Sequence, residues 1–261
     1  MITLTSDFAL CDPFVGVMKG VIASIAPSAP IVDLCHGVPP QDILAGALTL
    51  EESVAYFPSG TIHVAVVDPG VGSARAAVAL ETERAFYVGP DNGIFDFVLK
   101  KEPLKRAVKL ENPRYQLPVV SHTFHGRDIF APAAAHLFNG APLDDFGPPL
   151  AELTKLKMPA PIQHGGKLQL HILRVDHFGN IITDLKPPAY AEWNPENAPI
   201  KFEFMHTCFI GGILPAFTSV PECSPVAYFG SGGWLEIAIR NGNAAGYFKV
   251  ARGFSVMLEK L

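Results

Sequence analysis

The pattern of apolar residues changes abruptly near position 150, and this change constrains the fold more than any other feature. Before it, short β-type runs alternate with helix-type segments. The β-type runs are Ile2–Thr5, Ile31–Cys35, Thr61–Val67, Ala76–Glu81 and Ala85–Val88, and the helical segments are Phe14–Ile25, Asp42–Phe57 and Ile129–Phe138. Strands that alternate with helices predict a mostly parallel sheet with helices on both faces.

After position 150 the helical pattern is lost. The stretch Pro148 to Gly166 is rich in Pro, Lys and Gly, which is typical of a linker. Only short β-type runs separated by turn residues follow it: Leu168–Val175, Ile181–Leu185, Ile200–Met205, Val226–Gly230, Trp234–Ile239 and Val256–Glu259. We therefore expect an α/β domain over residues 1–150, a linker over 151–166, and a small all-β domain over 167–261, a barrel or a sandwich.

Composition excludes several classes of protein. Hydrophobic residues make up 49% of the chain and charged residues 17%, which favours a packed core over disorder. The net charge is −5 and there is no basic run, so a nucleic-acid interface is not expected. No apolar stretch reaches the roughly 18 residues of a membrane span. The four cysteines lack CxxC spacing and the N-terminus lacks a signal peptide, which predicts reduced thiols in the cytoplasm.

Polar residues follow several of the predicted strands, where parallel sheets bind ligands. Asp7 follows the first strand, and its carboxylate could accept both hydroxyls of a ribose or simply cap a turn. Asp68–Ser73 follows the third strand. Gly89–Gly93 follows a later strand and is more typical of a plain turn. These segments form the first group of candidate site residues.

A second group of candidates lies in loops. Within Ser121–Asp128, Arg127 and Asp128 could form a structural ion pair, whereas His125 could act as a general base. The segments Val175–Asn180, Ser231–Gly233 and Arg240–Asn243 have the composition of turns. Phosphate-binding, dinucleotide-binding and hydrolase motifs are absent from the sequence, and no histidines have the spacing of metal ligands, so we expect no metal.

Taken in order, these segments resemble the S-adenosylmethionine hydroxide adenosyltransferase family, which is related to fluorinating and chlorinating enzymes. The resemblance covers nearly the whole chain and depends on the ordered set rather than on one motif. The segments are Ser6-Asp7, Val32–His36, Val67–Gly72, Gly89–Gly93, Phe124–Asp128, Asp176–Asn180 and Ser231–Leu235.

The resemblance implies a fold and an activity. The fold is an N-terminal α/β domain, a linker and a C-terminal β-barrel. The activity is attack of water or hydroxide on the ribose C5′ of S-adenosyl-L-methionine, which gives adenosine and L-methionine. The family also implies a homotrimer, with sites between the N-terminal domain of one subunit and the C-terminal domain of the next. No cofactor beyond this substrate is implied.

Roles for individual residues follow from the resemblance. Asp68, Arg75 and His125 match the family's catalytic set, with Arg75 stabilising hydroxide and either His125 or Asp68 taking the proton. The remaining matches are to the substrate: Asp7 to the ribose, Asp176 to the methionine ammonium, Phe178 and Asn180 to the adenine, Ser231 to the methionine carboxylate, and Arg240 and Asn241 to the border of the adenine.

Two positions depart from the halogenating relatives. They carry arginine at the position of Gly232 and tryptophan at that of Gln41. Asp68 argues against a halide, because like charges 4 Å apart repel by about 4 kcal/mol at an effective dielectric constant near 20. Three alternatives to the hydrolase remain open: a sensor of S-adenosylmethionine or adenosine, a halide-using adenosyltransferase, and an unrelated nucleoside binder.

Overall fold

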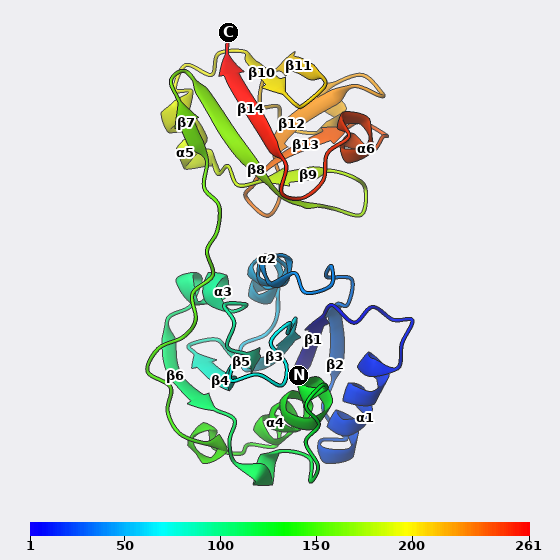
Figure 1. The fold of residues 1–261 in the computed structure, drawn as a ribbon, viewed down its shortest axis with the longest axis vertical. Helices are drawn as coiled ribbons and strands as arrows, with labels where there is room; N and C mark the ends of the chain where they lie inside the picture. Colours follow the sequence, from blue (N-terminus) through cyan, green and yellow to red (C-terminus); the bar gives the residue numbers. More distant parts are fainter. The chain divides into compact units, whose positions relative to one another are not determined.

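The computed structural model describes all 261 residues, which separate into two compact units, Met1–Lys157 and Met158–Leu261 (Figure 1). The first unit is an α/β domain with a mostly parallel mixed sheet, as predicted. The second is an antiparallel β-barrel that is nearly closed, so the prediction of a small all-β barrel is also confirmed.

The sheet of the first unit has the strand order β2-β1-β3-β5-β4-β6. Strands β2, β1, β3 and β5 run parallel, whereas β4 pairs antiparallel with both β5 and β6. The strands are β1 (Ile2–Ser6), β2 (Ile31–Cys35), β3 (Thr61–Val66), β4 (Ala77–Thr82), β5 (Ala85–Pro90) and β6 (Leu104–Lys109). The edge strand β6 was not predicted, because its outer half is exposed and charged rather than apolar.

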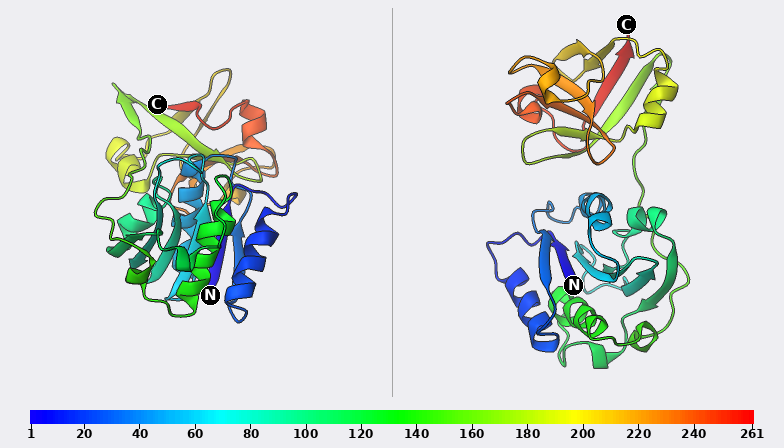
Figure 2. Two further views of the ribbon diagram at one scale, coloured as in Figure 1. Left: turned by 60° about the horizontal axis from the view of Figure 1, so that its bottom comes forward. Right: turned by 180° about the vertical axis from the view of Figure 1, so that it is seen from behind.

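Helices cover both faces of this sheet, as Figure 2 shows from two further sides. Alternate residues of β3 point to opposite faces, so Val64 joins the core beneath α1 and α4, and Ala65 joins the core beneath α2 and α3. The helices are α1 (Phe14–Ile25), α2 (Ile43–Ser53), α3 (Asp96–Lys101) and α4 (Ala131–Phe138). Each face therefore has a core of its own.

Two helix ends differ from the sequence prediction. The segment expected as one helix over Asp42–Phe57 is α2 followed by a 3₁₀ turn at Val54–Tyr56, because Pro58 cannot continue a helix. The late helix is preceded by a π-helical turn, Gly126–Phe130, so the helical segment begins close to His125. Such π-helical turns are frequent at functional sites.

The order of the strands creates a switch point between β1 and β3. The chain passes from β1 outward to β2 and then returns across β1 to β3. In open α/β sheets, ligands bind outside the carboxyl ends of the strands at such a point. Asp7 directly follows β1, and Asp68 lies two residues beyond β3.

The barrel of the second unit is built from eight strands, and its order is β11-β10-β14-β8-β9-β13-β12, with β7 paired to β8. A bridge between Ile213 and Ala227 brings the two ends of this order together. The strands are β7 (Ile162–His164), β8 (Lys167–Val175), β9 (Ile181–Thr183), β10 (Ile200–Glu203), β11 (Cys208–Gly211), β12 (Pro225–Phe229), β13 (Leu235–Ile239) and β14 (Ser255–Lys260).

Two short helices, α5 (Pro187–Trp193) and α6 (Ala244–Phe248), lie in the connections of the barrel. Phe248 is buried and stacks on Phe204 at a centroid distance of 4.0 Å, so α6 contributes to the barrel core. Neither helix was predicted, because segments of five to seven residues are too short to show a helical period.

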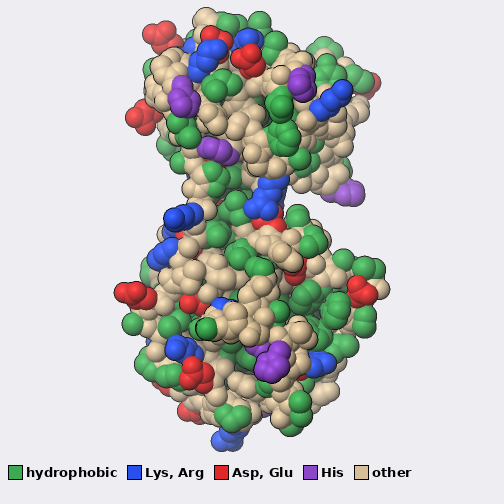
Figure 3. Space-filling view, in the orientation of Figure 1, with side chains coloured by type: hydrophobic (Ala, Val, Ile, Leu, Met, Phe, Trp, Pro, Cys, Tyr) green, Lys and Arg blue, Asp and Glu red, His purple; other side chains and the backbone are tan.

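The surface agrees with the modest net charge. On the face drawn in Figure 3, basic side chains are scattered among acidic and apolar ones and form no continuous stripe. None of the helices is both long enough and apolar enough to cross a bilayer.

Candidate active site

A pocket of about 420 Å³ lies in the first unit, at the switch point between β1 and β3. Asp7 and Asp68 line it from the ends of these two strands, and His125 lines it from the segment before α4. Residues far apart in sequence therefore meet because three chain segments end at the same edge of the sheet.

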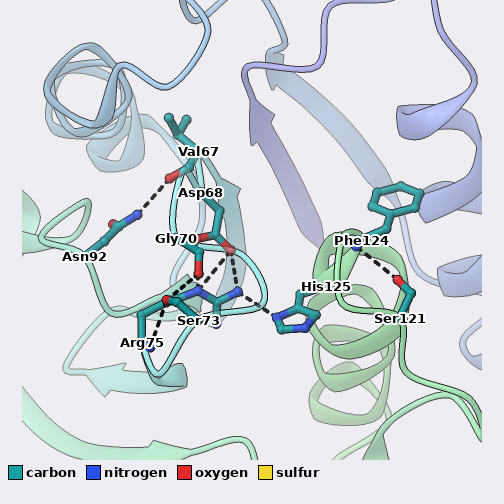
Figure 4. Close-up of polar contacts among 9 residues, drawn as sticks. All are labelled: Val67, Asp68, Gly70, Ser73, Arg75, Asn92, Ser121, Phe124 and His125. Atoms are coloured by element: carbon teal, nitrogen blue, oxygen red, sulfur yellow. Dashed lines mark hydrogen bonds and ion pairs between the residues drawn. The ribbon is translucent and has the colours of Figure 1, made fainter.

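The loop that follows β3 brings Arg75 back onto Asp68 (Figure 4). Within it, the Ser73 hydroxyl donates to the carbonyl of Gly70 at 2.6 Å and accepts the amide of Arg75 at 3.3 Å. Gly72 has φ +78°, and a β-carbon there would lie 2.5 Å from the carbonyl oxygen of His122. Glycine at position 72 thus allows this loop to approach the segment that carries His125.

Asp68, Arg75 and His125 form one hydrogen-bonded cluster. The Arg75 Nε lies 2.9 Å from Asp68 Oδ1 and 3.0 Å from Oδ2, and its Nη2 also donates to Oδ2. The same Nη2 lies 2.7 Å from His125 Nδ1. Arg75 and Asp68 are both largely buried, which strengthens their ion pair relative to an exposed one.

The direction of these hydrogen bonds determines the tautomer of His125. A guanidinium has only donors, so Nδ1 of His125 must be the acceptor. The neutral ring then carries its hydrogen on Nε2. Burial lowers the pKa of His125, and the nearby Arg75 cation lowers it further, although Asp68 and Asp128 oppose these effects. A hydrogen bond with the Ser121 backbone also opposes the lowering of the pKa. His125 is therefore neutral at pH 7 and carries its N–H on Nε2.

The structural ion pair considered for the Ser121–Asp128 segment is present. Arg127 forms an ion pair with Asp128, with Nε 2.5 Å from Oδ1, and the Asp128 side chain is fully buried. Asp128 Oδ2 also accepts the amide of Ser121 at 2.8 Å. The pair stabilises the loop, and His125 is thereby held at the pocket.

Asp7 is held by a backbone amide from the connection after β2. Its Oδ2 accepts the N–H of Gln41 at 2.8 Å, and Gln41 does not bind Oδ1. Gln41 has φ +65°, so the chain turns sharply at this contact. The backbone amide of Gln41 therefore orients the Asp7 carboxylate.

Aromatic residues that the sequence analysis missed form one wall of the pocket. Phe8, Phe14 and Phe124 pack together with centroid distances of 5.3 to 5.8 Å, and all three line the pocket. The available signal was adjacency, since Phe8 directly follows Asp7 and Phe124 directly precedes His125. Apolar residues beside charged ones have no period that would mark them as pocket residues.

The turn at Gly89–Gly93 also contacts the segment that carries Asp68. Asn92 donates from Nδ2 to the carbonyl of Val67 at 2.8 Å (Figure 4). Its Oδ1 accepts the amide of Ile94 at 3.2 Å. The Asp91 carboxylate instead accepts two hydrogen bonds from Thr154, one from the Thr154 amide at 2.9 Å and one from the Thr154 hydroxyl at 3.2 Å. The turn therefore supports the peptide bond directly before Asp68.

A second pocket, of about 630 Å³, lies wholly within the barrel unit. Four of the predicted residues line it: Phe178, Asn180, Arg240 and Asn241. Phe217 lines it as well and was missed, because it lies in a three-residue 3₁₀ turn, Phe217–Ser219, which is too short to show a period. Phe178 is 73% exposed and Phe217 41% exposed, so two aromatic side chains are available to contact a flat apolar ligand.

Asp176 and Ser231 occupy turns near the ends of barrel strands and are not among the residues that line this pocket. The Asp176 carboxylate accepts the amides of Phe178 and Asn180 at 2.9 and 2.8 Å, and the side-chain amide of Asn180 at 2.8 Å. Asp176 therefore orders the turn that presents Phe178. Ser231 is exposed.

No group of three His, Cys, Asp or Glu side chains is arranged to hold a metal ion. Asp68 and His125 of the first pocket are instead joined through Arg75, which forms an ion pair with Asp68 and a hydrogen bond with the neutral imidazole. Such a set offers a cation, a carboxylate and an N–H donor, which are groups that can bind and deprotonate a water molecule.

Two family profiles together match most of the chain. The SAM hydroxide adenosyltransferase N-terminal domain matches residues 2–147, and the SAM hydroxide adenosyltransferase C-terminal domain matches residues 170–257. The two matched ranges fall in the two units of the structure.

Several relatives match over nearly the full length. An (R)-S-adenosyl-L-methionine hydrolase from Thermus thermophilus is 41% identical over 97% of both chains, and one from Salinispora arenicola is 37% identical over 97% of this chain and 95% of its own. A fluorinase from Actinoplanes is 27% identical, and the match covers 100% of this chain and 97% of the fluorinase. The crystal structure of an uncharacterised conserved protein from Thermotoga maritima matches with a TM-score of 0.91 and 32% identity over all of both chains.

Proposed function

Because the chain belongs to the SAM hydroxide adenosyltransferase family, we propose that it hydrolyses S-adenosyl-L-methionine at the ribose C5′ and releases adenosine and L-methionine. The observation that carries the proposal is the Asp68–Arg75–His125 cluster at the switch point of the sheet. Hydrolases of this substrate are about equally similar to this chain over their whole length in two separate organisms.

The reaction is an in-line displacement at C5′. The oxygen of water forms a bond to C5′ while the C5′–S bond breaks. The electron pair of the C5′–S bond stays on sulfur and neutralises the sulfonium. Methionine leaves as a neutral thioether, so no acid is required for the leaving group. The protein must instead hold the water opposite sulfur, with its oxygen roughly 3–3.5 Å from C5′, and accept one proton.

We assign the proton to Asp68. The neutral His125 carries its hydrogen on Nε2, and its Nδ1 is occupied by Arg75, so neither ring nitrogen is free to accept. The Asp68 carboxylate has about four acceptor positions and receives three hydrogen bonds from Arg75. One position is thus left for the water, and the His125 N–H and the Arg75 cation stabilise the hydroxide that develops.

The substrate would be held by the other predicted residues. Asp7 has Oδ1 available for the ribose hydroxyls, since Gln41 contacts only Oδ2. Phe178 and Asn180, with Arg240 and Asn241 beside them, would contact the adenine, and Asp176 and Ser231 the two ends of the methionine amino acid. We further propose a cytoplasmic homotrimer in which the pocket of one subunit's N-terminal domain faces the barrel of the next.

The fluorinase relatives suggest a halide as an alternative nucleophile, and Asp68 opposes it. A carboxylate about 4 Å from a bound halide costs about 4 kcal/mol at an effective dielectric constant of 20, nearly a thousandfold in affinity. Arg75 offsets part of this repulsion but is itself committed to Asp68. Hydroxide formed in place from water does not meet this penalty, because the proton moves to the carboxylate as the charge develops.

The test is incubation with S-adenosyl-L-methionine in ¹⁸O-water without added halide. We expect adenosine with ¹⁸O at the 5′ position and free methionine. Asp68→Asn keeps the shape of the side chain and should lower turnover by roughly 10²–10⁴. His125→Gln keeps an N–H donor near the position of Nε2 and should retain far more activity. Intact substrate bound to the wild-type protein would instead identify a sensor.

A further inference from the structure

Behind Asp7 lies a chain of four polar side chains that the proposed mechanism does not use. Lys19 Nζ lies 2.5 Å from Asp33 Oδ2, and Asp33 Oδ1 lies 3.1 Å from His36 Nε2. His36 Nδ1 lies 2.7 Å from the hydroxyl oxygen of Ser6, the residue directly before Asp7. Ser6 and His36 are buried, at 1% and 7% exposure, whereas Lys19 and Asp33 reach solvent.

The donors in this chain have a single consistent direction. Lys19 only donates, and Asp33 accepts from both Lys19 and the Nε2–H of His36. With Nε2–H donated to Asp33, Nδ1 of His36 is the acceptor of the Ser6 hydroxyl hydrogen. The Ser6 oxygen in turn accepts the amide of Phe8 at 3.3 Å. Every member has a partner, which a buried polar group requires if it is not to destabilise the fold.

The main chain of His36 also binds the segment that follows Asp7. Its carbonyl oxygen accepts the amide of Ala9 at 2.9 Å. Ala9 has φ +54°, a left-handed conformation that is unfavourable for alanine and persists only where surrounding contacts hold it. His36 therefore binds Ser6 and Ala9, on the two sides of Asp7, and reaches Phe8 only through the Ser6 hydroxyl. The Asp7 carboxylate itself is fixed by Gln41 in the same connection.

We propose that His36 is a positioning residue that orients the Asp7 carboxylate toward the ribose hydroxyls, acting through Ser6 and the amides of Phe8 and Ala9. The inference rests on the proposed role of Asp7. Asp7 is the first residue after a strand and has no neighbour in the sheet to fix it. Contacts from the connection after β2 supply that constraint. Without them, the Asp7 side chain would populate several rotamers.

The chain offers a matched control on the same strands. Thr3 in β1 binds Nδ1 of His63 in β3 at 2.8 Å, and both residues are buried. This pair is also a hydroxyl on β1 bonded to a histidine, but it lies three residues before Ser6 and lines neither pocket. Removing its hydroxyl with Thr3→Val costs a buried hydrogen bond without affecting Asp7.

The experiment compares Ser6→Ala, His36→Leu, His36→Asn and Thr3→Val in the full chain. Adenosine affinity is measured by calorimetry, and KM and kcat with S-adenosyl-L-methionine are measured on the same preparations. We expect Ser6→Ala and His36→Leu to raise the adenosine Kd and KM about tenfold, the weight of one good hydrogen bond, with kcat changed less than about twofold. His36→Asn keeps an acceptor near Nδ1 and should lie closer to wild type. Thr3→Val should bind as wild type does.

A double variant separates positioning from general destabilisation. In an Asp7→Ala background, Ser6→Ala should cause no further loss of adenosine affinity, because its effect passes through Asp7. Additive losses in that background, or wild-type adenosine affinity in both Ser6→Ala and His36→Leu, would overturn the inference. Asp7→Ala with unchanged affinity would refute the proposed role of Asp7 itself. If His36→Leu does not fold, Ser6→Ala, which removes one oxygen atom, decides the matter.

Discussion

At the scale of single residues, the proposed chemistry depends on which atoms donate and which accept. Arg75 is the centre of the cluster, since its guanidinium contacts both Asp68 and His125 and lies over the ring of Phe130 at 5.3 Å. Lysine could not replace it, because an ammonium lacks the planar fork that binds a carboxylate with two nitrogens. The same fork fixes the histidine tautomer.

His63 should make stability depend on pH. Burial lowers the pKa of His63 to about 4, below its ordinary value of 6.5, so the unfolded chain takes up a proton that the folded chain does not. Stability from this residue is fully present above pH 6.5 and falls as the pH drops toward 4, by about 2 kcal/mol at pH 5. Urea unfolding of wild type and His63→Asn at pH 7.5 and pH 5 measures the difference.

The variant keeps an acceptor near Nδ1 for the Thr3 hydroxyl but has no group that titrates in this range. Its loss of stability between the two pH values should be smaller than that of the wild type by the amount above. Equal losses in both proteins would mean that His63 is not the residue responsible.

At the scale of elements, the ends of strands and the turns between them build the first pocket. Asp7 and Asp68 follow β1 and β3, and the loop after β3 folds back so that Arg75 returns to Asp68. The turn after β5 supports this loop through Asn92 and the Val67 carbonyl. Neighbouring strands thus hold one another's terminal segments.

Asn92→Asp tests this support. Aspartate keeps the acceptor for the Ile94 amide but loses the N–H that binds the Val67 carbonyl, so the peptide before Asp68 gains freedom. We expect kcat to fall by about tenfold, the weight of one hydrogen bond, while adenosine affinity stays at the wild-type value. Single-turnover kinetics and calorimetry measure the two effects. A parallel loss of adenosine binding would show that the turn supports the whole pocket instead.

At the scale of the whole molecule, the first unit has a hydrophobic core on each face of its sheet, the second unit has a core of its own, and each unit has a pocket. The proposed reaction needs residues from both, since the ionisable cluster is in the first unit and the exposed aromatic residues are in the second. In the homotrimer that we propose, these come from different subunits.

Mixed trimers test that arrangement. Asp68→Asn and Phe178→Ala, in differently tagged copies, should each be nearly inactive alone. Coexpressed in equal amounts, they should recover activity at about a quarter of the sites, namely those that combine an intact N-terminal domain with an intact barrel from the next copy. No recovery in trimers that carry both tags would indicate that each site uses one copy only.

The sequence alone was sufficient for the two-part fold. The alternation of strands with helices and the later succession of short strands are local patterns, set by which side chains can be buried at periods of 3.6 and 2.0. The ordered motifs were sufficient for the family, and the matches over both units confirm it. Elements without a clear apolar period, such as β6, α5 and α6, could not be predicted in this way.

The resemblance grouped Asp68, Arg75 and His125, but only the tertiary structure decided which of their atoms meet and in what direction they bond. Arg75 contacts His125 fifty positions away, and Ser6 contacts His36 thirty positions away, because strand order brings their segments to one edge of the sheet. No period or spacing encodes such contacts. The tautomer of His125, on which our proposed assignment of the proton to Asp68 rests, follows from a hydrogen bond that exists only once the chain is folded.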